Sequence, residues 1–448
     1  MNWSTRCTLC LLVSLAWQHN HAADAHELPA QAAVPIPNST IREYRSSRLH
    51  VQTDLPAVDA ELLYKRLEET LQFAARYWGR QPKGQIDCYV VHDLRAWSDA
   101  QLPHRLARVI INGVGGATVP RVVGTGKQSR NLPTVFASST PGVAEHEVIH
   151  AYCIHTFGSS GPEWYKEGMA EMVVKRATRD TGVHCSAEQI ETLRASGDTT
   201  LAQILATGGT GKRIATSLRR MMDDPTMQGQ HVSADAWTDR DSDNVSLARD
   251  EYLRSWAFCY MMLHNPNYSK RFRSLGNAFI AEQRDVFDEF FASARDKIEF
   301  EHQLFLKHAS IGYRVDLCAW DWSYRFSTLA EGQSQKACIV ACKGFQPTGV
   351  TVVGGQRYAY VADGSWALVK QGERINANGN HLGGGQLIGT VLTDRTLSDP
   401  FPLGTKGTLE SPASGKLYVR CQDAWNEIAD NTGEINITIS SLSYDVKP

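Results

Sequence analysis

The chain lacks an excess of either charge and lacks a long apolar run. Its 46 Lys and Arg residues nearly balance its 48 Asp and Glu residues, which leaves a formal net charge of −2 at pH 7. General attraction to nucleic acid or to an anionic membrane surface is therefore not expected. No segment reaches the roughly 18 uninterrupted apolar residues that a membrane-spanning helix needs, so we expect no transmembrane segment.

The first 25 residues have the layout of a cleaved secretory signal. Arg6 precedes an apolar run from Cys7 to Trp17, and small residues follow up to Ala25. The sequence therefore predicts a signal peptide over residues 1–25 and an exported protein, secreted or periplasmic. The chain has 10 cysteines. Without Cys7 and Cys10 in the signal, eight remain (10 − 2 = 8), and in an oxidising compartment some of them should form disulfides.

Composition divides the rest of the chain into three parts. Residues 26–48 are rich in Pro and Ala and lack periodicity, which indicates a linker or pro-segment. Residues 49–330 begin with strand-like and helix-like runs and become mainly helical after Val143, with a polar stretch at 227–248 that predicts a long loop. Short strand-like runs in residues 340–448 predict an all-β sandwich. The predicted fold class is α+β, in which a small sheet and a mainly helical part precede the sandwich.

Particular elements can be placed by their periodicity. Strands are expected at 49–55, 85–91 and 131–138, and an amphipathic helix at 60–78. The run 252–265 is apolar on more than one face, which indicates a buried helix.

The run His146-Glu147-Val148-Ile149-His150 has the pattern His-Glu-x-x-His. On a helix, two histidines four residues apart project from one face, where their neutral nitrogens can hold two corners of a tetrahedral zinc site. Glu147 lies about 100° further round the helix, where it can accept a proton from a water molecule that zinc activates. The alternative is an ordinary helix with two exposed or structural histidines.

The segment 161–171, GPEWYKEGMAE, supplies further candidate groups. Pro162 suits a first helical turn, and the glycine- and serine-containing run before it suits a turn between two helices. An antiparallel return of this second helix brings Glu167 level with the two histidines, as a third zinc ligand, and leaves the fourth position for water. Glu171, one turn further on, can hydrogen-bond a ligand imidazole. The alternative is that these acids form a solvated helix face.

The combination of HEVIH with W-Y-K-E-G-M-A-E resembles the gluzincin clan of zinc metallopeptidases, in particular the secreted peptidase MA-like group. The resemblance implies His146, His150 and Glu167 as zinc ligands and Glu147 as general base. It also implies a Tyr or His that stabilises the oxyanion, for which Tyr252 is the candidate. The Gly-x-Met-Glu-Asn segment of one large aminopeptidase family is missing, which does not favour aminopeptidase activity.

The C-terminal part contains candidate calcium ligands. Asp423, Asp430 and Asn431 offer oxygen atoms around a tight turn, which suits calcium but is also ordinary hairpin chemistry. Residues 345–445 resemble the galactophilic calcium-dependent lectin PA-I. The resemblance implies Asp423, the backbone carbonyl of Glu427, Asp430 and Asn431 as calcium ligands, and a carbohydrate partner.

The sequence therefore predicts a secreted zinc metallopeptidase of gluzincin type that acts on proteins or peptides, glycoproteins included. A C-terminal module that binds calcium and carbohydrate would target it. The alternative is a secreted carbohydrate-binding protein whose metallopeptidase-like domain is inactive. Nucleic acid is not expected as a partner.

Overall fold

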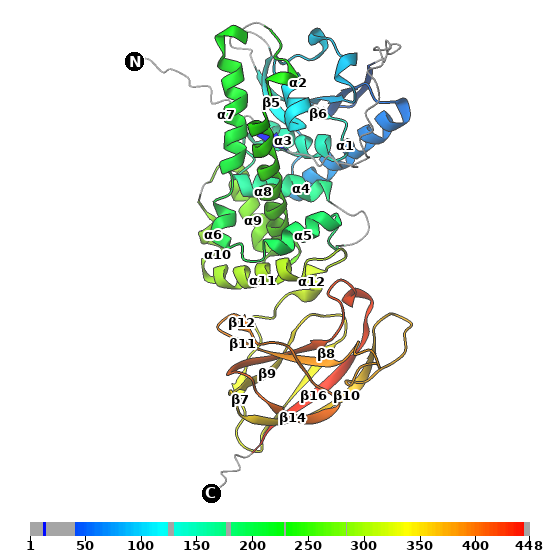
Figure 1. Cartoon of the computed structure of the whole chain (residues 1–448), viewed down its shortest axis with the longest axis vertical. Helices are drawn as coiled ribbons and strands as arrows, with labels where there is room; N and C mark the ends of the chain where they lie inside the picture. The colour runs from blue at the N-terminus through cyan, green and yellow to red at the C-terminus, as the bar shows by residue number, and fades with distance from the viewer. Residues whose placement is uncertain are drawn as a thin grey trace, which may run out of the picture. The chain divides into compact units, whose positions relative to one another are not determined.

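The computed structural model describes residues 12–14, 41–123, 130–175, 181–227, 230–283 and 285–442. These residues form two compact units, and each contains both helices and strands. The first unit comprises Met1–Arg176, Ala202–Tyr260 and Arg271–Phe290, and the second comprises Ala177–Leu201, Met261–Lys270 and Phe291–Pro448. The chain is thus mixed α and β (Figure 1). Within the described residues, no helix combines the length and the apolar character that crossing a membrane requires.

A mixed sheet forms the base of the first unit, with strand order β1-β5-β6-β4-β3-β2. Its strands are β1 (Leu12–Ser14), β2 (Arg42–Arg45), β3 (Leu49–Thr53), β4 (Ile86–Val91), β5 (Gly116–Val123) and β6 (Arg130–Ser138). Strands β3, β4 and β6 run parallel, and β5 pairs antiparallel with β6. Residues 12–14 pair antiparallel with Gly116–Thr118 of β5. The remainder of the expected signal peptide, and residues 26–40 of the expected linker, lie outside the described residues.

Helices of the first unit pack on this sheet and on one another. They are α1 (Ala57–Trp78), α2 (Ala107–Val109), α3 (Val143–Phe157), α4 (Glu163–Val174), α6 (Leu201–Leu205), α7 (Gly209–Asp223), α8 (Asp239–His264), α9 (Ser269–Ile280) and α10 (Phe287–Phe291), of which α6 and α8–α10 cross into the second unit at one end. α3 contacts β4, β5, β6, α1 and α4, and most of its side chains are buried. The helix with the histidine motif is therefore enclosed on several sides.

Close contact between α4 and α8 depends on a glycine. A Cβ atom on Gly168 would lie 2.5 Å from Sγ of Cys259 and 2.6 Å from the backbone oxygen of Ser255. Any side chain at position 168 would push the two helices apart, because real Cβ atoms do not approach other atoms this closely. The Glu-Gly pair at 167–168 therefore combines a candidate ligand with the residue that lets its helix pack.

Two sheets of a β-sandwich form most of the second unit. Their strands are β7 (Ser327–Thr328), β8 (Ser334–Val340), β9 (Gln346–Val352), β10 (Arg357–Ala367), β11 (Leu387–Thr393), β12 (Thr396–Leu397), β13 (Phe401–Pro402), β14 (Lys406–Glu410), β15 (Gly415–Cys421) and β16 (Thr432–Ser441). One sheet has the order β14-β10-β16-β8 and the other β12-β11-β15-β9-β7, with β13 paired to β11. Alternating side chains of both sheets, such as Ile435, Ile437 and Ile439, fill the space between them.

Helices α5 (Ala187–Ala195), α11 (Arg295–His308) and α12 (Val315–Cys318) belong to the same unit as the sandwich. Phe300 of α11 and Trp320 pack with Phe345 and Tyr418 in one apolar cluster. Phe300 and Trp320, which composition groups with the preceding helical part, therefore pack against residues of the sandwich.

A buried carboxylate, Glu301 of α11, joins three separate segments of the second unit. It accepts hydrogen bonds from Asn265 Nδ2 (2.6 Å), Asn267 Nδ2 (3.2 Å), Tyr268 Oη (2.6 Å), the backbone N of Trp320 (3.0 Å) and Trp322 Nε1 (2.6 Å). Burial raises the pKa of Glu301, although these hydrogen bonds act in the opposite direction. Removing the carboxylate would take a buried acceptor from each of these donors, although Asn267 Nδ2 also donates to the backbone oxygen of Trp320 (2.8 Å).

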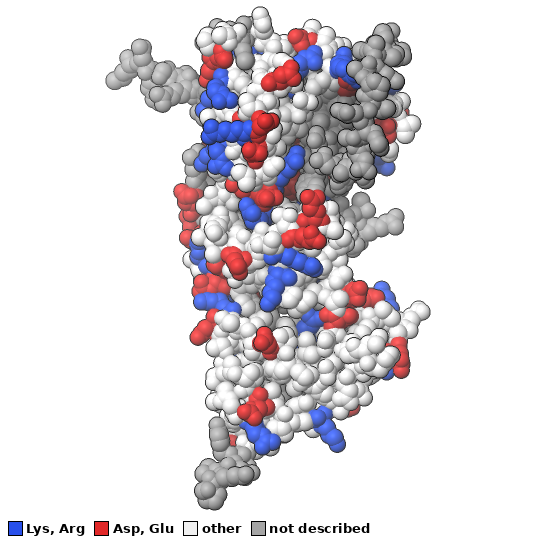
Figure 2. Space-filling view, in the orientation of Figure 1, with Lys and Arg blue, Asp and Glu red and all other residues white. Residues whose placement is uncertain are grey.

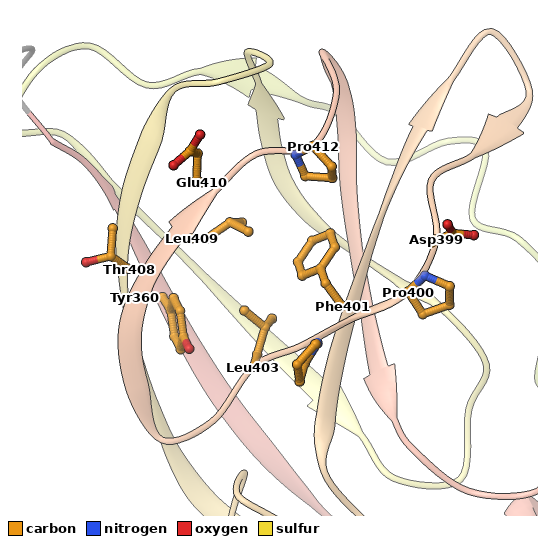
Figure 3. A pocket seen from close by; sticks show the side chains of 10 residues that line it. Tyr360, Asp399, Pro400, Phe401, Leu403, Thr408, Leu409, Glu410 and Pro412 are labelled. Atoms are coloured by element: carbon orange, nitrogen blue, oxygen red, sulfur yellow. The ribbon is translucent and has the colours of Figure 1, made fainter.

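A pocket of about 380 Å³ opens on the sandwich (Figure 3). It is lined by Tyr360, Asp399, Pro400, Phe401, Pro402, Leu403, Thr408, Leu409, Glu410 and Pro412. Ala367 of β10 pairs with Thr432, next to the candidate calcium residues, while Tyr360 lies seven positions earlier on the same strand. At about 3.3 Å per residue this separation is roughly 23 Å, so the pocket and the candidate calcium loop are different features.

Several expectations from the sequence are corrected. The polar stretch 227–248 is not one long loop, because α8 begins at Asp239. Thr238 and Asp241 form reciprocal hydrogen bonds there, Thr238 N to Asp241 Oδ2 (3.1 Å) and Asp241 N to Thr238 Oγ1 (3.3 Å), which caps the helix. Arg42–Arg45, inside the expected linker, form β2.

Disulfides are also absent where the sequence led us to expect them. None of the eight cysteines from Cys88 to Cys421, all of which lie within the described residues, forms a disulfide. Cys88, Cys153 and Cys259 are buried in the first unit, where desolvation raises the pKa of each thiol and favours the uncharged form. They behave as small apolar core residues.

Replacing Glu301 by Ala should destabilise the second unit by about 3–5 kcal/mol, because five donors lose their buried acceptor. Urea unfolding followed by tryptophan fluorescence measures this loss. Glu299→Ala on the same helix serves as the control, since the Glu299 side chain forms no hydrogen bond within the described residues. Equal losses in the two variants would mean that Glu301 does not hold these segments together.

Candidate metal centre

The histidine motif and the second acidic motif lie on two consecutive helices. α3 ends at Phe157 and is capped by Gly158, which has φ 87°, and α4 begins at Glu163 after Pro162. Positive φ at Gly158 and at Gly161 reverses the chain within a few residues, which other residue types rarely allow. The helix–turn–helix arrangement predicted from the sequence is therefore present.

This hairpin brings the three predicted ligands together. His146 Nε2 lies 3.0 Å from His150 Nε2 and 3.1 Å from Glu167 Oε2, and His150 Nε2 lies 3.4 Å from the same oxygen. Ligand atoms about 2.0–2.1 Å from a tetrahedral metal lie about 3.3–3.4 Å from one another. The donor set and its spacing therefore fit Zn²⁺. Within the described residues, this is the group of three or more His, Cys, Asp or Glu side chains with converging ligand atoms.

The hydrogen bond on the far side of His146 fixes which atom faces the group. Nδ1 of His146 lies 2.9 Å from Glu171 Oε1, and this carboxylate also pairs with Lys175. Because the ionised Glu171 can only accept, Nδ1 carries a proton, and Nε2 is the atom that would offer a lone pair to a metal. With a metal bound, the lone pairs of both Nε2 atoms and of Glu167 Oε2 would point to one buried position, which fits a cation.

Without a metal, the electrostatics of the three groups are those of a buried carboxylate beside one protonated and one neutral imidazole. Burial alone would lower the pKa of His146, but its hydrogen bonds to Glu167 and Glu171 raise that pKa to about 10. Burial lowers the pKa of His150 to about 4 and keeps its imidazole neutral, as a metal ligand must be. Burial would raise the pKa of Glu167, yet His150 and His146 hold it well below its usual range.

The hydrogen-bond partner of Glu147 lies outside the group of candidate ligands. Its Oε2 accepts a hydrogen bond from Thr118 Oγ1 of β5 (2.9 Å), whereas its Oε1 is buried with no hydrogen-bond partner among the described residues. Burial raises the pKa of Glu147 to about 8. A carboxylate with one anchored oxygen and one available oxygen is suited to accept and return a proton.

The buried cation Lys166 lies next to the candidate ligands. Its Nζ is 2.9 Å from Glu163 Oε2 and 3.5 Å from Glu167 Oε1, and its side chain is 9% exposed. Burial would lower the pKa of Lys166, but the two glutamates raise it, so the side chain remains charged. Neither Lys166 nor Thr118 was predicted from the sequence. Lys166 could have been found from its i,i+3 spacing to Glu163, whereas Thr118 lies on β5, a strand that the pattern did not reveal.

Tyr252 lies close to the group, although not where the sequence placed it. It is in the middle of α8 rather than at the start of a helix, because α8 begins at Asp239. Its ring centroid lies 6.3 Å from that of His146, and its side chain is 1% exposed. Cys153 is buried on α3 and is not part of the converging ligand group.

The predicted calcium residues lie in the loop before β16. Oδ2 of Asp423 and Oδ1 of Asn431 are buried without a hydrogen-bond partner among the described residues. Glu427 and Asp430 lie between them in the chain, at a short 3₁₀ turn over Ile428–Asp430. Buried Asp and Asn oxygens without a partner are candidate cation ligands, because calcium takes oxygen ligands of this kind.

Comparison with known proteins gives only distant likenesses. No protein-family model and no curated protein matches the chain. The EclA N-terminal domain, a PllA-like lectin, is 22% identical over 24% of this chain and 95% of that chain, with a TM-score of 0.20. Two structures of IMPa from Pseudomonas aeruginosa, a metallopeptidase, are 13% and 14% identical over 44% and 42% of this chain, each with a TM-score of 0.17. One of them is a complex with an O-glycopeptide. The alignment covers 23% of the IMPa chain, and no function is inferred from likenesses of this size.

Glu171→Gln removes only the hydrogen-bond partner of a candidate ligand and should reduce zinc affinity roughly 10–100-fold. His150→Ala removes a candidate ligand itself and should reduce zinc affinity by more than this. Competition against a chromophoric chelator measures both affinities. His155→Ala on the same helix is the matched control, because this histidine lies outside the converging group. Undiminished zinc binding in His150→Ala would rule out the predicted ligand set.

Proposed function

We propose that this chain is a zinc-dependent metallopeptidase of gluzincin type that hydrolyses peptide bonds. The observation that supports this most strongly is the convergence of His146, His150 and Glu167 within 3.0–3.4 Å. Glu147 is buried on the same helix as the two histidines and keeps one carboxylate oxygen without a hydrogen-bond partner among the described residues. A purely structural metal site would not need a buried acid that takes no part in the ligand group.

Zinc bound by the three ligands would lower the pKa of a water molecule toward 7 and polarise a substrate carbonyl. Oε1 of Glu147 accepts the proton of the attacking water and passes it to the leaving amine nitrogen. Thr118 holds the other oxygen of Glu147 in place, which limits rotation of the carboxylate. Glu171 holds the ring of His146 in the tautomer whose Nε2 faces the ligand group.

Tyr252 is the proposed stabiliser of the developing oxyanion. Its hydroxyl lies on the side of Gly211, because a Cβ atom on that glycine would be 3.4 Å from Tyr252 Oη. Burial raises the pKa of Tyr252, and the nearby Glu167, Glu163 and Glu147 raise it further. The charged phenolate is therefore disfavoured. A hydroxyl that keeps its proton can donate a hydrogen bond to an oxyanion.

We also propose that the protein is exported and that its C-terminal module binds calcium and carbohydrate, which would direct the peptidase to glycosylated protein or peptide substrates. The two buried, unpartnered oxygens of Asp423 and Asn431 support the calcium proposal. A second candidate function is that of a secreted carbohydrate-binding protein with an inactive metallopeptidase-like domain. The unpartnered Oε1 of Glu147 favours the peptidase.

Glu147→Gln should lower the cleavage rate by about 10²–10⁴-fold, because the amide cannot accept the proton, while zinc stays bound. Cleavage of a mixed peptide library, read by mass spectrometry beside zinc content, measures both effects. Glu191→Gln, an exposed site on α5, is the control. If neither wild type nor the variants cleave peptides or glycopeptides, the binding-protein function replaces the peptidase.

Calcium should stabilise the second unit by about 2.7 kcal/mol at a concentration 100 times its Kd, since it binds only the folded loop. Thermal unfolding with calcium, with magnesium and with a chelator measures the stabilisation. Asp423→Asn should remove most of it, whereas Asp363→Asn on β10 should leave it intact. A glycan array read with and without chelator then shows whether sugar binding depends on calcium, and calcium-independent unfolding would end the calcium proposal.

A further inference from the structure

The two carboxylate oxygens of Glu167 face different partners. Oε2 lies 3.1 Å from His146 Nε2 and 3.4 Å from His150 Nε2, within the ligand group. Oε1 lies 3.5 Å from Lys166 Nζ and has no hydrogen-bond partner among the described residues. One oxygen is thus directed at the candidate metal position and the other at a buried cation.

Lys166 is held in place from its other side. Its ammonium group lies 2.9 Å from Oε2 of Glu163, one helical turn earlier on α4. With 9% of its side chain exposed, Lys166 has little room to move toward solvent. The lysine therefore stands between two acids, one of which is the candidate ligand.

The start of α7 keeps Glu163 in position. A Cβ atom on Gly208 would lie 2.8 Å from Glu163 Cβ, and one on Gly211 would lie 2.7 Å from Glu163 Oε1. Gly208 has φ 132°, a conformation that other residues rarely adopt. The glycine-containing turn before α7 therefore packs directly on the acid that anchors Lys166.

We propose that Lys166 is a positioning residue that makes Glu167 a one-oxygen ligand and so keeps a coordination position open. This inference rests on the proposed function. A carboxylate that binds a metal through both oxygens occupies space otherwise available to water and substrate. Lys166 gives Oε1 a charged partner in a buried environment, so that only Oε2 faces the metal.

The test replaces Lys166 by Met, which keeps the length of the side chain and removes its charge. The probe is Co²⁺ bound in place of zinc, because its visible absorption is stronger in a four-coordinate site than in a five-coordinate one. Loss of Lys166 should lower this absorption more than twofold at one equivalent of metal, and should lower kcat about tenfold with little change in KM. Lys166→Arg should restore most of both signals.

Three comparisons make the outcome decisive. Lys65→Met, exposed on α1, is the matched control and should behave as wild type. Lys166→Gln, which is neutral but polar, is used if the Met variant does not fold. Its cobalt absorption should also be lower than that of the wild type. An unchanged cobalt spectrum in a folded, fully loaded Lys166 variant overturns the positioning role. A wild-type spectrum that does not depend on His150 instead overturns the proposed function.

Discussion

The burial of the Glu167 carboxylate between two imidazoles is the constraint on which the candidate metal centre depends. His146, His150 and Glu167 face one another within 3.0–3.4 Å, and a buried carboxylate is tolerated there only beside a cation, which a protonated His146 or a bound metal would supply. The fold holds them there because α3 is enclosed by the sheet, α1 and α4. Gly168 adds to this, since it lets α4 lie close against α8 directly beside the candidate ligand Glu167.

Acidic residues around the site are balanced by lysines on the same helix. Glu171 pairs with Lys175, and Glu163 and Glu167 share Lys166. Buried acids are tolerated only when charge or hydrogen bonds compensate them, so each lysine makes a nearby carboxylate possible. At the surface, by contrast, Lys and Arg lie among Asp and Glu over the face drawn in Figure 2.

Much of this site could be predicted because it is local in the sequence. The four-residue spacing of His146 and His150, and a short turn before Glu167, specify distances through helix geometry alone. Thr118 could not be predicted, since its contact with Glu147 depends on how β5 is placed in the sheet. The start of α8 was missed although Thr238 and Asp241 carry a capping pattern, because the polar residues after them obscure the helical periodicity.

In the second unit, the sequence pattern revealed strands but not their dependence on helices. Phe300 and Trp320 lie before the first sandwich strand, yet they pack against Phe345 and Tyr418, and Glu301 collects donors from residues 265–268 and 320–322. The strands of the sandwich therefore do not bury their apolar surface by themselves and need the helical residues that pack on them. A gene fusion that moved only the strands to another protein would expose this aromatic surface to water. The sandwich would therefore have to be transferred together with its flanking helices.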